Sequence, residues 1–252
     1  MSGSRRFRWI AIAAVLASNF SGCGGTTEGT EVLVSAAASL TDAFAELERS
    51  FETATPGVDV VLNFGGSAAL REQILAGAPV DVFASANTAT MDAVVAAGET
   101  AETPRIFATN LLAIAVPPDN PAGIVGLEDF ARPEVLIGFC AAAVPCGGFA
   151  REALSRAGVD PAVDTNEPDV RALLTKIEEG ELDAGIVYST DIVAAAGLVR
   201  GITIGDAANI VAEYPMAVLA AAPHPEEAAA FTAFVHSPVG TAILAEHGFG
   251  TP

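Results

Sequence analysis

Four short segments place small, neutral hydrogen-bond donors at the expected starts of helices. Ser39 ends the run "VSAAAS", Ser67 follows two glycines in "NFGGS", and Cys146 follows a proline in "AAAVPC". Val170 begins the run "VRALL" directly after Asp169. The first N–H groups of a helix have no intrahelical acceptor and carry positive partial charge, so together they could bind an anion. Taken singly, each segment is equally explained by ordinary capping or turn formation.

Two further residues bear on this anion-site hypothesis. Tyr188 ends the apolar run "GIVY" and is one of only two tyrosines in the chain, so its phenol adds a neutral donor at a strand end. Asp42 stands three residues after Ser39, which is the spacing of a capping box. We therefore expect Ser39 both to cap the helix that follows it and to donate to an anion.

The composition limits the classes of partner. The chain of 252 residues carries 12 basic and 31 acidic residues, a formal net charge of −19. Loss of residues 1–22 would remove three arginines and no acid, leaving 9 basic and 31 acidic residues and a net charge of −22. Without a basic footprint the protein is not expected to bind nucleic acid, and its acidic surface would keep an exported protein solvated.

The N-terminus has the organisation of an export signal. Three arginines within residues 5–8 form a basic region, an apolar stretch of 12 residues follows ("WIAIAAVLASNF"), and "SGCGG" comes next. The small pair before Cys23 resembles the processing site of bacterial lipoproteins. This predicts a lipoprotein-type signal peptide over residues 1–22, lipidation of Cys23 and a flexible tether over residues 23–30. The alternative is ordinary secretion after nearby cleavage, which would leave a periplasmic protein.

The other two cysteines, Cys140 and Cys146, have five residues between them. Outside the cytoplasm a pair this close predicts a disulfide, and two free buried thiols are the alternative. The three histidines are scattered and no cluster of His and Cys has ligand spacing. We therefore expect neither a metal cation nor a cofactor.

Apolar runs alternate with amphipathic segments along the chain, which predicts helices alternating with strands in a largely parallel arrangement. The expected helices span residues 39–53, 67–76, 88–97, 146–157 and 168–180, and two short helices end the chain. Residues 182–190 are expected to form a buried strand. The long apolar run at 105–118 could cross between two halves of the molecule.

Two α/β units joined by extended crossings predict an α/β fold of two lobes around a cleft. Ligands of such folds bind beyond the carboxyl ends of strands, where helices begin. We expect one lobe to comprise residues 31–112 and 214–252 and the other to comprise residues 113–213. Hinges are expected at 109–113 and 212–216, so a ligand held by both lobes would stabilise the closed form.

Seven segments between residues 31 and 250 resemble, in order, the periplasmic molybdate-binding proteins, the solute receptors of molybdate ABC transporters. They are "AAASLTDAF", "NFGGSAALREQILAGAPVDVFASA", "VPCGGFAREAL", "DVRALL", "GIVYSTD", "EYPMAVL" and "HGF". The resemblance implies a bilobal type II periplasmic-binding-protein fold that holds one oxyanion between its lobes. Cys146 departs from the alanine of many relatives, which matters little if only its N–H binds.

The resemblance also implies the ligand contacts. These are the hydroxyl and amide of Ser39 and of Ser67, the amides of Cys146 and Val170, and the phenol of Tyr188. Molybdate is a fully deprotonated tetrahedral dianion that offers only acceptors, so it suits neutral donors at helix N-termini. Tungstate is nearly the same size and is expected to bind, whereas sulfate would be rejected by size. Arg171 is expected in a salt bridge or at the surface rather than on the ligand.

By the same resemblance, the protein would capture molybdate by lobe closure and deliver it to the membrane permease of an ABC transporter. We expect a monomer, anchored by its N-terminal lipid on the extracytoplasmic face and without enzymatic activity. A hydrolase is disfavoured because Ser67 is not in a G-x-S-x-G elbow and no histidine stands in a catalytic context. The effector domain of a regulator is disfavoured by the export signal. A receptor for another oxyanion such as sulfate, or for a small organic acid, stays open because a fold does not fix its ligand.

Overall fold

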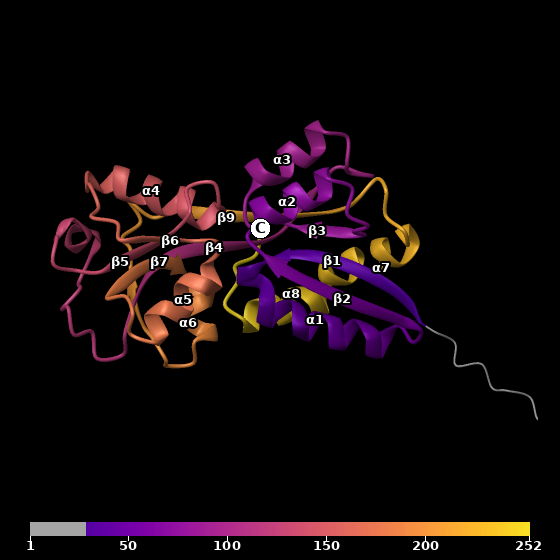
Figure 1. The fold of residues 1–252 in the computed structure, drawn as a ribbon. Coiled ribbons are helices and arrows are strands. Elements are labelled where there is room, and N and C mark those ends of the chain that lie inside the picture. The colour runs from indigo at the N-terminus through magenta and orange to yellow at the C-terminus, as the bar shows by residue number, and fades with distance from the viewer. Residues whose placement is uncertain (1–28) are drawn as a thin grey trace, which may run out of the picture.

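The apolar runs of the sequence become the strands of one mixed sheet, which a computed structural model describes over residues 29–252 (Figure 1). The strands are β1 (Thr30–Ala37), β2 (Val58–Gly65), β3 (Val82–Ala84), β4 (Arg105–Val116), β5 (Ile137–Cys140), β6 (Thr165–Glu167), β7 (Ala184–Tyr188), β8 (Arg200–Thr203) and β9 (Val211–Val218). The α-helices are α1 (Thr41–Ala54), α2 (Ser67–Leu75), α3 (Thr88–Ala96), α4 (Pro145–Ala157), α5 (Val170–Glu178), α6 (Ser189–Ala194), α7 (Pro225–Val235) and α8 (Pro238–Glu246). Two 3-10 helices, η1 (Ala38–Leu40) and η2 (Leu127–Ala131), complete the described elements.

The order of the strands explains why distant segments meet. Within residues 29–252 the order is β2-β1-β3-β9-β4-β7-β5-β6, and β8 pairs with β4. Strands β1 and β2 are parallel and in register from Thr30↔Val58 to Ala37↔Gly65, so both end at one edge. In the other lobe β5 runs parallel to β6 and to β7. Each predicted donor therefore follows, or ends, a strand whose carboxyl end faces the middle of the molecule.

The centre of the sheet differs from the largely parallel arrangement that was predicted. Strands β4 and β9 pair antiparallel with each other, with Leu111 opposite Val211. From Leu112 onward β4 instead pairs antiparallel with β7, and from Ala113 also with β8. A single long strand thus belongs to both lobes, as Figure 1 shows. The predicted lobe boundaries and hinges near these residues remain a prediction.

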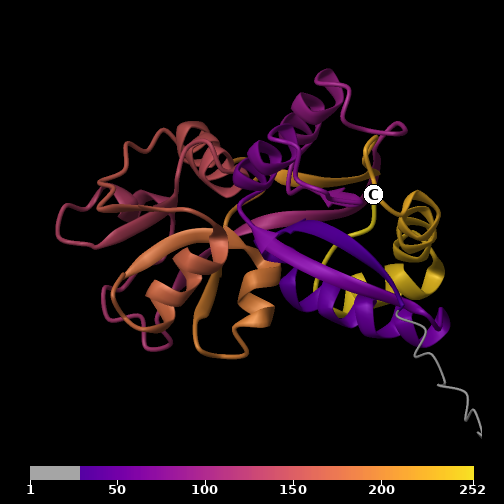
Figure 2. The ribbon, with the colours of Figure 1, turned by 45° about the vertical axis from the view of Figure 1, so that its right-hand side comes forward.

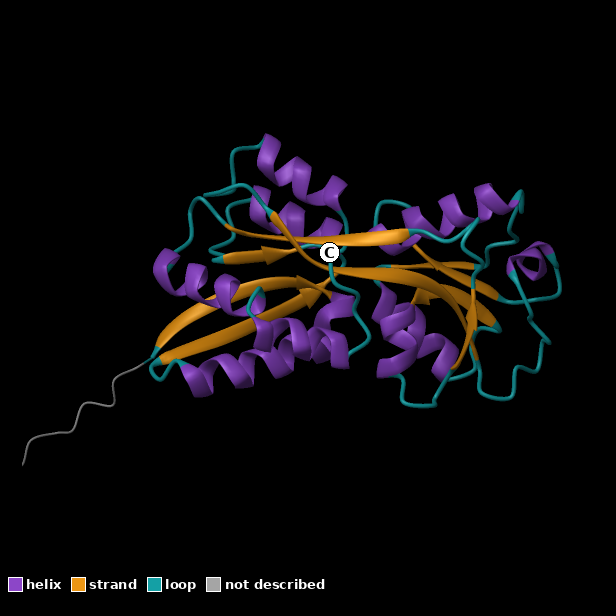
Figure 3. Cartoon of the chain, turned by 180° about the vertical axis from the view of Figure 1, so that it is seen from behind, coloured by secondary structure: helices purple, strands orange, loops and turns teal. Residues whose placement is uncertain are grey.

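Helices cover both faces of the sheet in each lobe. Helices α2 and α3 lie on one face of the first lobe, and α1, α7 and α8 lie on the other (Figures 1 and 3). In the second lobe α4 lies opposite α5 and α6, an arrangement that also shows in the turned view of Figure 2. Aromatic contacts pack within each lobe: Phe51 of α1 meets Phe231 of α7 at 5.3 Å between ring centroids, and Phe130 of η2 stacks on Phe139 of β5 at 5.8 Å. The two-lobed α/β fold predicted from the sequence is confirmed.

Several boundaries differ from the prediction. The strand expected at 182–190 ends at Tyr188, because α6 begins at Ser189, and the short β6 and α6 were not anticipated. Residue 30, which the prediction placed in the tether, already pairs in β1, and residues 23–28 of the predicted tether lie outside the described residues. The predicted signal peptide and Cys23 lie outside the described residues. Among the residues that are described, no single helix is long and apolar enough to cross a membrane, and the one pair that would be, α7 with α8, is bent by 61°.

Candidate functional site

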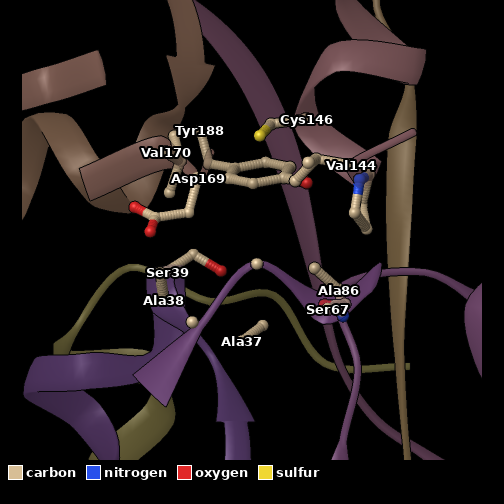
Figure 4. Close-up of a pocket in the computed structure, with 13 residues that line it drawn as sticks. Ala37, Ala38, Ser39, Ser67, Ala86, Val144, Cys146, Asp169, Val170 and Tyr188 are labelled. Carbon is tan, nitrogen blue, oxygen red and sulfur yellow. Dashed lines mark hydrogen bonds between the residues drawn. The ribbon is translucent and has the colours of Figure 1, made fainter. Parts of the chain in front are cut away.

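All five residues predicted to bind an anion line one pocket between the lobes (Figure 4). The cavity volume is only about 10 Å³, so the two walls lie close together in this structure. Its walls are Ala37, Ala38, Ser39, Gly65, Gly66, Ser67 and Ala86 from one lobe, and Val144, Pro145, Cys146, Asp169, Val170 and Tyr188 from the other. None of these lining residues is Lys, Arg or His. The hydrogen-bond donors of the pocket wall are therefore neutral N–H and O–H groups.

Ser39 does not cap a helix, so the capping-box prediction with Asp42 is wrong. The chain leaves β1 through the 3-10 turn η1, and α1 begins only at Thr41, without a side-chain cap. The Ser39 side chain is buried and its hydroxyl lies 3.0 Å from the hydroxyl of Tyr214. The alanines before Ser39 permit this tight turn at the pocket wall.

Tyr214, which sequence reasoning missed, orients the Ser39 hydroxyl. Asn110 Nδ2 donates to the Tyr214 hydroxyl at 3.4 Å, and Asn110 Oδ1 is itself held by the Ser189 hydroxyl at 2.9 Å. Either hydroxyl could donate in the Ser39–Tyr214 bond; since the Tyr214 oxygen already accepts from Asn110, we infer that Tyr214 donates to Ser39 Oγ, which would free the Ser39 proton for a ligand. Burial raises the pKa of Tyr214, which keeps its phenol neutral. No local spacing could have linked residues that are 175 positions apart.

Ser67 has a comparable arrangement at the start of α2. Its side chain is buried, and its Oγ accepts the Ala86 N–H at 3.1 Å, so the hydroxyl proton is free to point into the pocket. The N-cap of α2 is Gly66, which has no side chain to occupy the first amides. The N–H groups at this helix start therefore lack an intrahelical acceptor and face the same space.

Helix α4 brings the Cys146 amide to the opposite wall. A disulfide joins Cys146 to Cys140 at the end of β5, with their Cα atoms 5.8 Å apart. Gly147 packs directly beneath this turn, because a Cβ there would lie 2.1 Å from the Ala141 carbonyl oxygen and 2.4 Å from that of Cys140. Arg151 donates to the Cys140 and Gly147 carbonyls at 3.0 and 2.9 Å. The turn that presents the Cys146 N–H is thus held covalently and by hydrogen bonds.

Helix α5 presents Val170 as its first residue. Asp169 caps this helix, since its Oδ1 accepts the N–H groups of Arg171 at 2.9 Å and Ala172 at 3.0 Å. These bonds leave the Val170 N–H without an intrahelical acceptor. Asp169 is an acid in the wall of a pocket expected to contain only donors. Its carboxylate is turned toward its own helix and lies across the Tyr188 ring from Val144 in Figure 4.

Tyr188 supplies a buried donor without a partner. Its side chain is 1% exposed, and within the described residues its hydroxyl makes no hydrogen bond. Burial raises the pKa of this phenol well above its usual value, so it stays protonated. A buried hydroxyl left unpaired costs about 1–3 kcal/mol, which a ligand oxygen in the pocket would recover.

Beneath the pocket lies a buried carboxylate, Asp191, whose Oδ2 accepts the Tyr188 N–H at 2.9 Å. Burial raises the pKa of Asp191 to about 7, against the opposing effect of Arg171. Arg171 Nε lies 3.6 Å from Asp191 Oδ1, and its Nη2 pairs with Asp42. Arg171 is therefore salt-bridged and absent from the pocket lining, as predicted.

Three of the four helix starts at the pocket, those of η1, α2 and α4, have no side-chain cap. Among the helices that begin elsewhere, α3 and α8 are capped by the side chains of Asn87 and Ser237, whereas α1 and α7 also lack a side-chain cap, so it is the meeting of these starts in one pocket that matters. The uncapped amides, two serine hydroxyls and one phenol make a neutral set of donors suited to an oxyanion. Within residues 29–252 no group of three or more His, Cys, Asp or Glu side chains could hold a metal ion.

A mixed sheet whose strand β4 belongs to both lobes, together with a pocket between the lobes, is the architecture of a solute-binding protein. Residues 32–250 match the family described as bacterial extracellular solute-binding protein, and the chain belongs to this family. The description as extracellular indicates export, and the family is not an enzyme class. The predicted resemblance to the molybdate-binding proteins is confirmed.

Two relatives with curated names illustrate this membership. The molybdate-binding protein ModA of Mycobacterium tuberculosis is 36% identical over 97% of this chain and 100% of its own length. ModA of Escherichia coli is 32% identical over 96% of this chain and 98% of its own length.

Solved structures share the fold. The Azotobacter vinelandii periplasmic molybdate-binding protein superposes with a TM-score of 0.76 at 19% identity, covering 88% of this chain and 99% of that one. The sulfate-binding protein SubI of M. tuberculosis reaches 0.79 at 20% identity, covering 87% of this chain and 86% of that one. Since the two neighbours are named for different anions, the fold alone does not select the ligand.

Proposed function

We propose that this protein captures molybdate, and also tungstate, in the pocket between its lobes. The observation that carries the proposal is the convergence of neutral donors: the Tyr188 hydroxyl without a partner, the Ser39 and Ser67 hydroxyls, and uncapped helix starts. A tetrahedral dianion accepts hydrogen bonds at every oxygen, so it can use each of these donors. The names of the two ModA relatives support the same ligand.

Neutral donors also account for discrimination between anions. Phosphate carries a proton near neutral pH, whereas molybdate and tungstate carry none. The one carboxylate in the pocket wall, Asp169, already accepts the N–H groups of Arg171 and Ala172 through its Oδ1, so we expect the pocket to favour anions without a proton. Sulfate has the same charge and shape but is smaller, so a fixed ring of donors would reach it poorly. Sulfate or a small organic acid is the alternative ligand, since SubI shares the fold.

Capture would proceed by closure of the lobes. The lobes touch beside the pocket, where a Cβ on Gly66 would lie 2.5 Å from the Pro168 carbonyl oxygen. Residues 109–113 and 212–216 are the proposed hinges, near the point where β4 exchanges β9 for β7 as its partner. The closed form would then be recognised by the permease of an ABC transporter, with the protein held at the membrane by a lipid on Cys23.

A thermal-shift titration of ligand-free protein tests the ligand directly. Molybdate and tungstate at about 100 times their Kd should each add about 2.7 kcal/mol of stability, which is visible as a higher melting temperature. Sulfate and phosphate at the same concentration should shift it little. A shift with sulfate equal to that with molybdate would favour the alternative ligand. No shift with any oxyanion would remove the proposed function and leave the fold standing.

A further inference from the structure

One salt bridge joins the two lobes at the edge of the pocket. Arg171, the second residue of α5, pairs through Nη2 with Asp42 in the first turn of α1. Arg171 Nε also donates to the carbonyl of Ala38 at 3.4 Å. Among the salt bridges within residues 29–252, this is the only one that connects the lobe of β1 to the lobe of β5. Its partners adjoin the proposed ligand contacts, since Arg171 follows Val170.

Two acids of its own lobe surround Arg171. Asp191, which is fully buried, lies 3.6 Å from Arg171 Nε. Asp169 accepts the backbone N–H of Arg171 at 2.9 Å and so fixes the first turn of α5. Both acids belong to the same lobe as Arg171, but only Asp191 faces its guanidinium, because Asp169 holds the backbone of the first turn. Among the described residues, Asp42 is the one acid that pairs with Arg171 from across the cleft.

We propose that Arg171 is a positioning residue that latches the closed form by pairing with Asp42 and thereby slows release of the bound oxyanion. This inference rests on the proposed function, because it assumes that closure traps a ligand. The ion pair exists only when the lobes meet, so its energy favours the closed form without a contact to the ligand. Both side chains are partly exposed, at 28% and 48%, so the pair is screened by salt. The guanidinium pairs with Asp42 and lies 3.6 Å from Asp191, and Arg171 is not among the residues that line the pocket.

The test compares release rates of radiolabelled molybdate, chased with unlabelled molybdate, in the wild-type protein and Asp42→Asn. The matched control is Asp92→Asn, which removes an equal charge from an exposed position on α3 that makes no salt bridge within the described residues. We expect about twofold to fivefold faster release from Asp42→Asn, a nearly unchanged association rate, and wild-type behaviour in the control. Asp42→Glu keeps the charge and should restore slow release.

Salt provides the readout that a merely structural role would not move. Raising NaCl from about 0.05 M to about 0.5 M should speed release from the wild-type protein more than from Asp42→Asn, because only the former has an interlobe pair to screen. Release at the wild-type rate from Asp42→Asn, with the same dependence on salt, would overturn the latch while the proposed function stands. Failure of the wild-type protein to bind any oxyanion would instead overturn both.

Discussion

The two walls of the pocket hold their donors by different means. In the lobe of β1, Ser39 and Ser67 offer hydroxyls whose direction is set by single hydrogen bonds, from Tyr214 and from the Ala86 amide. In the lobe of β5, the Cys146 turn is fixed by a disulfide and by Arg151. One wall is therefore adjustable by rotation of its hydroxyls, whereas the other has a rigid backbone at the Cys146 turn, with the Tyr188 hydroxyl as its rotatable donor. A rigid wall sets the size of the site, while the rotatable wall completes the hydrogen bonds after closure.

Loss of the unpartnered donor should have the largest effect on affinity. Tyr188→Phe removes a hydroxyl that has no partner within the protein, so stability should stay equal or rise slightly. A hydrogen bond to a charged ligand is worth about 1.5–3 kcal/mol, so molybdate affinity should fall about 10- to 100-fold. Calorimetric titration together with urea unfolding measures both quantities. Loss of stability without loss of affinity would show that the Tyr188 hydroxyl serves the fold instead.

A side chain that prevents the two lobes from closing fully should have the next largest effect on molybdate affinity. In Gly66→Ala the backbone angles, φ −61° and ψ 128°, suit alanine, but the new Cβ would lie 2.5 Å from the Pro168 carbonyl oxygen in the other lobe. Overpacking of this kind costs about 1–3 kcal/mol, so we expect about tenfold weaker binding. The open form should be unaffected.

The matched control for closure is Gly65→Ala. Its Cβ would meet only the Leu70 side chain, at 3.5 Å, which is ordinary contact within one lobe. Calorimetric titration of both variants should therefore separate them. Equal affinities for Gly65→Ala and Gly66→Ala would contradict the view that the lobes close this tightly around the ligand.

Removing the partner that orients the Ser39 hydroxyl should reduce molybdate affinity less than the two changes above. Tyr214→Phe leaves Ser39 without its oriented partner, and we expect about threefold to tenfold weaker molybdate binding, since a neutral hydrogen bond is worth about 0.5–1.5 kcal/mol. Ser39→Ala should weaken binding well beyond its effect on stability. In the Ser39→Ala background, Tyr214→Phe should have no further effect on affinity. Additive effects of the two changes on affinity would show that Tyr214 does not act through the Ser39 hydroxyl.

Softening the rigid wall should change affinity least. Replacement of Cys140 and Cys146 by serine opens a short loop, which should lower stability by about 2 kcal/mol. Molybdate affinity should fall only about twofold to fivefold, because the Cys146 N–H remains and loses only its fixed position. Denaturant unfolding and titration under oxidising and reducing buffer check the two effects on the wild-type chain. An affinity loss larger than that of Tyr188→Phe would reverse the comparison of the walls.

The sequence was informative where chemistry is local. Strand ends, glycines and prolines marked the helix starts that carry Ser67, Cys146 and Val170, and the structure brings all of them to one pocket. The capping role expected for Ser39 failed because a 3-10 turn intervenes, and the competing turn geometry leaves no sign in a four-residue pattern. Tyr214 escaped notice because its partner is distant along the chain and only the sheet order makes them neighbours.

The strand pairing at the centre of the sheet could not be predicted from local sequence patterns. The antiparallel centre of the sheet follows from β9 returning beside β4, which no hydrophobic period specifies. The same applies to the Asp42–Arg171 pair, in which the two residues come from different lobes. Such contacts require the folded topology.

The decisive measurement is a crystal structure of the protein with bound molybdate, in which the anomalous scattering of molybdenum locates the ligand. We expect one molybdenum position in the pocket, with oxygens accepting from Ser39 and Ser67 on one wall and from Cys146, Val170 and Tyr188 on the other. A molybdenum position outside this pocket, or contacts from one wall only, would contradict it.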